Sequence, residues 1–171
     1  MINSLITKTS MCTSYVTHEN GRIRMSKEYM ANVTVSLADL RDMRDVQKES
    51  LKYANGATTL EKFENILAGL ANIISIFKSN YYLTFALTLE NLLSYLTNAE
   101  KTVLKNTLEN GREAISDMID YMVDHPQYDK LKIDFPFLEY TDSQGRIVRL
   151  VEGDGLITAR HKIDPEGWLY I

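Results

Sequence analysis

The strongest constraint on this fold is a long central segment, residues 36–125, in which apolar residues recur at intervals of three and four positions. This period places them on one face of an α-helix. Ser36, Thr58 and Thr97 are each followed three positions later by an acidic residue, which is the signature of a capping box at a helix start. With a further break at residues 78–80, the segment is predicted to form four helices, and Pro126 follows the last of them.

The two flanking segments, residues 1–35 and 126–171, favour short extended strands. Their apolar runs are rich in β-branched and aromatic residues and are separated by turn residues. Asn20-Gly21 is the strongest hairpin signal, because a type I′ turn needs positive φ at both central positions. The sequence therefore predicts β-structure at both ends of the chain.

The stretch VEGDGLITARH, residues 151–161, contains two carboxylates, two glycines and a histidine. Gly153-Asp154-Gly155 sits between two strand-like runs, so we interpret it as the turn of a β-hairpin and not as a catalytic loop. His161 follows Asp154 at a distance of roughly 20 Å along a strand. We therefore expect no acid–histidine pair within this stretch.

Together these patterns predict an α+β fold, with a central antiparallel bundle of about four helices flanked by N-terminal and C-terminal short antiparallel β-strands or hairpins. The corresponding regions are an N-terminal β segment (residues 1–35), a helical bundle (36–125) and a C-terminal β segment (126–171), which we expect to form one compact domain. Whether the strands of the two ends share one sheet stays open at this point.

Composition excludes several classes of protein. The formal net charge of −4 argues against a general nucleic-acid binder, whose affinity comes largely from Lys and Arg. The one cysteine, Cys12, cannot close an intrachain disulfide, and Cys-rich zinc sites are excluded with it. The N-terminus lacks the pattern of a signal peptide, and the longest apolar stretch, Ile66–Phe77, is too short to span a bilayer. We expect a cytoplasmic protein, or one assembled into a particle from the cytoplasm, with neither a membrane nor a nucleic acid as its partner.

The fourth helix carries a heptad-like seam of apolar residues, interrupted by Gly111. Such a seam can pack inside an intramolecular bundle, which we favour, or against a second copy of the chain. The aromatic and aliphatic end of the chain can likewise dock on its own sheet or on the sheet edge of another subunit. The candidate interface residues are Leu104, Leu108, Ile115, Met118, Met122, Trp168, Leu169 and Tyr170.

The same helix carries an acidic stripe at spacings of three and four, formed by Glu109, Glu113, Asp117, Asp120 and Asp124. Like charges at this spacing destabilise an isolated helix by roughly 0.2–0.5 kcal/mol per pair. Three explanations fit. The stripe is a solvated face, which we favour, or a surface that binds a basic site on a partner protein, or a set of ligands for a divalent cation.

For a cation site, Glu61 and Glu64 of the second helix could face Asp117 and Asp120. These paired ExxE and DxxD helices resemble the magnesium sites of all-α nucleotide pyrophosphohydrolases. The resemblance implies metal-dependent hydrolysis of nucleotides by the four carboxylates. The chain departs from that family because it lacks recognisable basic and aromatic positions for the nucleotide and carries β segments at both ends.

The rest of the sequence presents no coherent active site. Its three histidines fall in three different regions, and HExxH, CxxC, Gly-rich phosphate loops and GxSxG are absent. We therefore expect a non-enzymatic structural or assembly protein that acts through oligomerisation, such as a phage or virion component or an adaptor, with no cofactor. The alternatives are a small acidic regulator that binds a basic site on a partner protein, and the metal-dependent nucleotide hydrolase.

Overall fold

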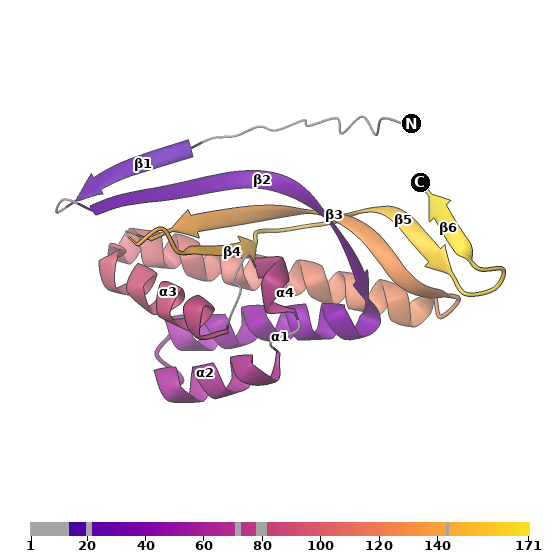
Figure 1. The fold of residues 1–171 in the computed structure, drawn as a ribbon, viewed down its shortest axis with the longest axis horizontal. Helices are drawn as coiled ribbons and strands as arrows, with labels where there is room; N and C mark the ends of the chain where they lie inside the picture. Colours follow the sequence, from indigo (N-terminus) through magenta and orange to yellow (C-terminus); the bar gives the residue numbers. More distant parts are fainter. Residues whose placement is uncertain (1–13, 20–21, 71–72, 78–81, 143) are drawn as a thin grey trace.

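The computed structural model describes residues 14–19, 22–70, 73–77, 82–142 and 144–171. Within these ranges the chain forms four α-helices, one 3₁₀ helix and six strands (Figure 1). The helices are α1 (Leu37–Ala54), α2 (Leu60–Gly69), the 3₁₀ helix η1 (Ile74–Phe77), α3 (Tyr82–Tyr95) and α4 (Asn98–Asp124). The strands are β1 (Ser14–Glu19), β2 (Arg22–Ser36), β3 (Tyr128–Thr141), β4 (Ile147–Val151), β5 (Leu156–Lys162) and β6 (Gly167–Tyr170).

The six strands in the described part of the chain belong to one antiparallel sheet, in the order β1-β2-β3-β5-β6, with β4 also paired to β3. β2 and β3 form the centre, and their register runs from Met25 opposite Thr141 to Ser36 opposite Lys130. The other edge of β3 is shared by β5 and, beyond a gap, β4. The strands of both chain ends therefore lie in one sheet.

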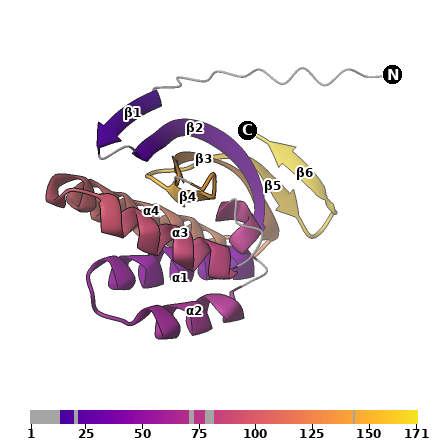
Figure 2. The same ribbon diagram turned by 60° about the vertical axis from the view of Figure 1, so that its left-hand side comes forward.

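The predicted central bundle flanked by short strands is wrong. Figures 1 and 2 show the helices gathered on one side of the sheet, where α1 packs against α4, and α3 and α4 contact β4. β2 and β3 are 15 and 14 residues long. β2 runs without a break through the polar residues 26–28, where Ser26 and Lys27 pair with β1 on one edge and all three residues pair with β3 on the other. The result is an α+β arrangement built on a single sheet.

Pro136 lies in the middle of β3, where its missing N–H would normally interrupt a central strand. Its carbonyl accepts a hydrogen bond from the Glu152 N–H at 2.9 Å. Within an antiparallel strand the N–H and C=O of one residue point to the same side. The missing donor therefore faces Glu152, in the connection between β4 and β5, and no pair of the β3–β4 or β3–β5 register is lost.

The hairpin predicted at VEGDGLITARH is also wrong. β4 and β5 both run antiparallel to β3 along the same edge, so residues 152–155 join two strands that point in the same direction. Position 155 has room only for glycine, because a Cβ there would lie 2.6 Å from side-chain atoms of both Ile133 and Phe135. The first hairpin is confirmed by the antiparallel pairing of β1 and β2, although its turn, Asn20-Gly21, lies outside the described residues.

The helix starts of α1 and α4 are confirmed as predicted. Ser36 and Thr97 accept hydrogen bonds from the backbone N–H groups three residues later, and both capping boxes are complete. The second helix differs from its prediction, because Thr59 caps it in place of Thr58, it ends at Gly69, and η1 is a separate turn. Among the described helices, none has the combination of length and apolar character needed to cross a membrane.

Gly111 sets the distance between the helices and the sheet. A Cβ at this position would lie 2.0 Å from the Val151 carbonyl oxygen at the end of β4, and 2.3 Å from the side-chain nitrogen of Gln47. Gln47 of α1 is fully buried and donates a hydrogen bond to the same carbonyl at 2.9 Å. The α1–α4 pair is therefore fixed to β4 at one point.

Candidate functional site

The heptad-like seam of α4 is filled from within the chain. Leu104, Leu108 and Ile115 are fully buried, and Met122 is 3% exposed. These four side chains belong to the hydrophobic core that α1 and the sheet also line, and Met118 packs at its margin. Most of the seam therefore faces the core of its own chain.

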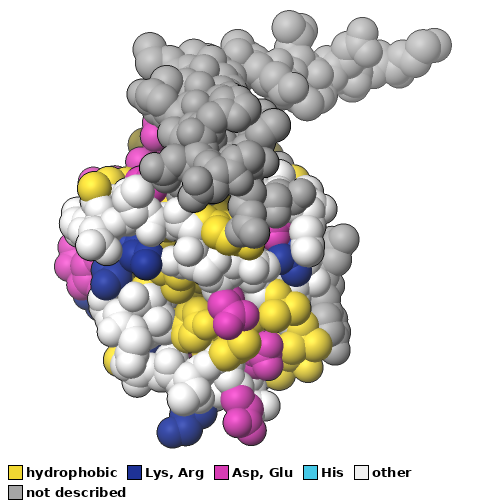
Figure 3. Space-filling model, turned by 90° about the vertical axis from the view of Figure 1, so that its left-hand side faces the viewer, with side chains coloured by type: hydrophobic (Ala, Val, Ile, Leu, Met, Phe, Trp, Pro, Cys, Tyr) yellow, Lys and Arg dark blue, Asp and Glu magenta, His cyan; other side chains and the backbone are white. Residues whose placement is uncertain are grey.

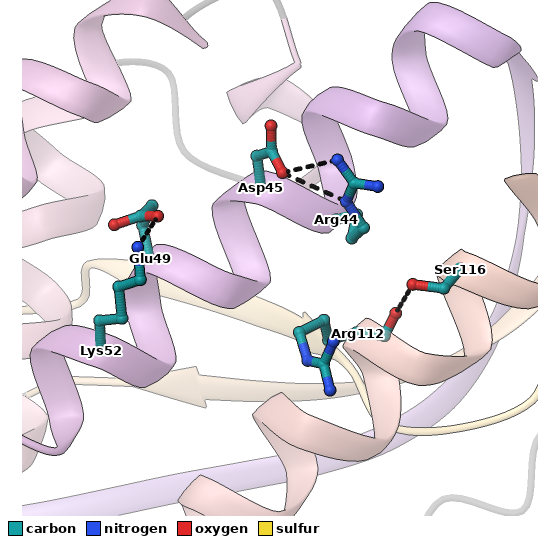
Figure 4. A network of polar contacts seen from close by, with 6 residues as sticks. All are labelled: Arg44, Asp45, Glu49, Lys52, Arg112 and Ser116. Atoms are coloured by element: carbon teal, nitrogen blue, oxygen red, sulfur yellow. Dashed lines mark hydrogen bonds and ion pairs between the residues drawn. The ribbon is translucent and has the colours of Figure 1, made fainter.

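Arg112 pairs with the first two carboxylates of the acidic stripe. Its guanidinium lies 2.5 Å from the Glu109 carboxylate and 3.7 Å from that of Glu113. The hydrogen bond that Arg112 donates holds the pKa of Glu109 below its ordinary value. Figure 4 shows further polar contacts on α1 and α4, and each of those drawn joins residues of the same helix, as Arg44 joins Asp45 at 3.0 Å. Such local pairs lower the local charge without forming a binding site.

The carboxylate pairs considered for a cation are not brought together. Glu61 and Glu64 lie on α2, which packs against α1 and α3, on the side of α1 away from α4 (Figures 1 and 2). Asp117, Asp120 and Asp124 are exposed on α4. In the part of the chain that the structure describes, no three His, Cys, Asp or Glu side chains are arranged to hold a metal ion. This geometry does not support the hydrolase.

Trp168, Leu169 and Tyr170 lie on β6, the last strand of the sheet. β6 pairs with β5 along one edge, and no described strand pairs with its other edge. The exposed fractions of Leu169, Tyr170 and Ile171 are 48%, 72% and 71%. Residues 167–171 include neither a charged residue nor a proline, the residues with which natural proteins commonly protect an open edge. β6 therefore combines unpaired backbone groups with exposed apolar side chains.

Lys132 of β3 fixes the aromatic side chains of this edge. Its ammonium lies 4.5 Å from the centroid of the Trp168 ring and 5.0 Å from that of Tyr170, and it donates a hydrogen bond to the Tyr170 hydroxyl at 3.1 Å. A cation over an aromatic ring at an exposed site contributes about 0.5–1 kcal/mol. These contacts hold both rings against the sheet.

His161 lies beside the same edge, between two carboxylates. Its Nδ1 is 2.6 Å from Asp129 Oδ1, and its Nε2 is 3.9 Å from Glu166 Oε1. The Trp168 ring packs edge-on against the imidazole, with 5.0 Å between centroids. The hydrogen bond from His161 holds the pKa of Asp129 below its ordinary value. These contacts join β3 to the β5–β6 hairpin.

We expect Asp129→Asn to destabilise the fold by less than about 1 kcal/mol, because the carboxylate is partly exposed. A carboxyl whose pKa is lowered on folding stabilises the protein above its ordinary pKa, and this contribution is lost as the pH falls through the folded value. The deficit of the variant should therefore be present near about pH 6 and shrink below about pH 4. Urea denaturation at several pH values measures it, with the exposed Asp154→Asn as control; a deficit independent of pH would contradict the assignment.

A second polar cluster lies inside the sheet. Glu139 of β3 is 8% exposed and accepts a hydrogen bond from the Tyr29 hydroxyl at 2.8 Å. Arg149 of β4 is directly opposite Glu139 in the register and donates to the same hydroxyl at 3.2 Å. The guanidinium also donates to the Ile76 carbonyl of η1. This cluster joins three strands and η1, and its burial suits a structural role.

An apolar groove lies at the β6 end of the molecule. It has a volume of about 500 Å³ and runs between the start of α1, the end of α4 and the loop after β5, where Leu37, Met122 and Ile163 line it. Ile163 is 55% exposed, and Val123 on the same groove is 53% exposed. Together with β6, the groove makes this end of the molecule rich in accessible apolar side chains.

The opposite end of the molecule differs in character. Figure 3 faces that end and shows hydrophobic side chains interrupted by acidic and polar ones. A separate hollow of about 570 Å³, between α1 and α2, is lined by Glu49, Lys52 and Lys62 among others. Lys52 contacts Glu49 there at 2.7 Å. The β6 edge is therefore the stronger candidate for a functional surface.

Comparison with known proteins adds no relative: no protein family, no curated protein and no solved structure matches the chain. Of the apolar residues singled out in the sequence, Leu169 and Tyr170 are exposed and Trp168 between them and the hairpin turn is half-buried, all three on β6. Sequence reasoning missed Lys132 and the Asp129–His161 pair, because no spacing pattern links residues that lie more than 30 positions apart.

Proposed function

We propose that this protein is a non-enzymatic structural or assembly protein that works by associating with other protein chains through the β6 edge. The observation that carries the proposal is an uncharged edge strand whose exposed side chains are apolar, with Leu169, Tyr170 and Ile171 each about half exposed or more. An open edge of this kind is a template for pairing with another chain. The neighbouring groove adds apolar surface that a partner could bury.

The polar clusters also favour association over catalysis. His161 is hydrogen-bonded to Asp129 through Nδ1 and has Glu166 3.9 Å from Nε2, and the Tyr29–Glu139–Arg149 cluster is built into the sheet. The contacts of both clusters serve to join strands. The acidic stripe on α4 is left as a secondary surface, and its binding to a basic partner stays a prediction.

Light scattering on the purified chain, over a concentration series, tests this function. We expect a mass above 19.6 kDa that rises with concentration towards a fixed multiple, because a short edge strand buries too little surface for a permanent complex on its own. A mass that stays at that of the monomer throughout the series would contradict assembly by oligomerisation.

A further inference from the structure

The backbone of β6 has a defined direction at its open edge. The Ile171 N–H donates to the Thr158 carbonyl of β5 at 3.0 Å. Since backbone groups of successive residues in an antiparallel strand point alternately to the two sides, Ile171, Leu169 and Gly167 direct theirs towards β5. The N–H and C=O groups of Trp168 and Tyr170 therefore point away from the sheet, towards any chain that joins it.

From this geometry we propose that the partner is a second copy of this chain. The two β6 strands pair antiparallel, and the two-fold axis that relates the copies passes midway between their Leu169 residues. Trp168 of each copy then lies opposite Tyr170 of the other. Both are residues with outward backbone groups, so each of the two pairs exchanges two N–H···O=C bonds. The inference rests on the proposed function and specifies the partner and register of the same edge.

The side chains of β6 favour a copy of itself over an unrelated strand. An aromatic residue stands on each side of Leu169, so the two-fold places Leu169 against Leu169 on one face and aromatic against aromatic on the other. A two-fold interface must be self-complementary, and cross-strand aromatic pairs are among the favourable ones. Since residues 167–171 carry no charged side chain, the pairing brings no like charges together within the strand.

The register predicts a specific cross-link. Leu169 opposite Leu169 is a non-hydrogen-bonded pair, in which the Cα atoms are about 4.5 Å apart, within the range that a disulfide bridges. With Cys12 replaced by serine, Leu169→Cys should form a disulfide-linked dimer on air oxidation, whereas Tyr170→Cys, opposite Trp168, should not. A cross-link through position 170, or through neither position, would overturn this register.

A charge at the axis tests the same pairing without a cross-link. Leu169→Lys places two like charges opposite each other and should weaken self-association by about tenfold or more, as measured by light scattering. Leu156→Lys is the matched control, because Leu156 is a 65% exposed leucine on β5 and lies outside the pairing; its self-association should be unchanged. Circular dichroism confirms that both variants are folded.

The outcomes separate this inference from the function on which it rests. If the chain associates but Leu169→Lys leaves association unchanged, the two-fold β6 pairing is overturned while the assembly function stands. If the chain is a monomer at every concentration, both fail. Loss of association in Leu169→Lys alone, with the cross-link at position 169, supports the pairing.

Discussion

Replacing Gly111 with alanine should destabilise the fold by about 3 kcal/mol, at the upper end of overpacking effects. The added Cβ would meet the Val151 carbonyl at 2.0 Å and the Gln47 amide nitrogen at 2.3 Å. The Val151 carbonyl oxygen belongs to the backbone of β4 and cannot turn aside as a side chain can, so α4 must move away from β4. The same movement breaks the buried hydrogen bond from Gln47 to that carbonyl. The higher helix propensity of alanine, about 1 kcal/mol, does not offset these losses.

Gly69→Ala is the matched control for this experiment. Gly69 is also a helical glycine, but a Cβ there would meet nothing within 4 Å. That variant should be neutral or slightly more stable, by up to about 0.5–1 kcal/mol, from the lower backbone entropy of the unfolded chain. Urea denaturation of the two variants gives the comparison. A Gly111→Ala protein as stable as the wild type would show that α4 and β4 can separate without cost, against the close approach described.

Gly111 also shows where sequence reasoning reaches its limit. In the sequence it is an interruption of the heptad-like seam, whereas in the structure it is the point of closest approach between α4 and β4. Helix starts could be predicted because a cap such as Ser36 with Asp39 is complete within four residues. Gly111 lies against Val151, which is 40 positions later in the chain, and no local sequence pattern predicts this contact.

The sheet was mispredicted for the same reason. The turn residues at 153–155 suggest a hairpin, which requires β4 and β5 to pair with each other. In the structure both strands pair with β3 instead. Proline is uncommon in a central strand, and Pro136 fits here because its missing N–H faces the connection between β4 and β5. Strand pairing is set by contacts between distant residues, so the starts of α1 and α4 were predictable and the arrangement of the strands was not.

In the candidate site, too, the features set by neighbouring residues could be predicted, and the contacts between distant residues could not. The composition of the last residues was enough to suggest a terminal strand that docks on its own sheet or on that of another subunit, and Trp168, Leu169 and Tyr170 do lie on a strand of the chain's own sheet. The contacts that fix its shape come from elsewhere in the chain, since Lys132 reaches the two rings from β3. The seam of α4 was a weaker guide, because an apolar stripe at helical spacing has the same pattern whether it faces a core or a second subunit.

Glu139→Ala should also destabilise the protein by about 3 kcal/mol, the upper end of the usual cost of leaving a buried polar group without its hydrogen-bond partner. The Tyr29 hydroxyl would lose its acceptor, and the Arg149 guanidinium the carboxylate that lies opposite it in the sheet. The cost should not exceed this value because Arg149 keeps other contacts, to the Ile76 carbonyl and to the face of the Phe137 ring at 4.2 Å.

A double-mutant cycle with Tyr29→Phe separates the hydrogen bond from the rest of this effect. In the wild type, Tyr29→Phe should cost about 1 kcal/mol, the typical net value of one hydrogen bond. In the Glu139→Ala background it should cost less, because the hydroxyl no longer has its carboxylate acceptor, and the difference is the coupling between the two side chains. The exposed Glu113→Ala serves as control and should change stability by no more than about 0.5 kcal/mol. Additive effects in the cycle would mean that the Tyr29–Glu139 contact contributes nothing, and the cluster would then owe its stability to the pairing of Glu139 with Arg149 across β3 and β4.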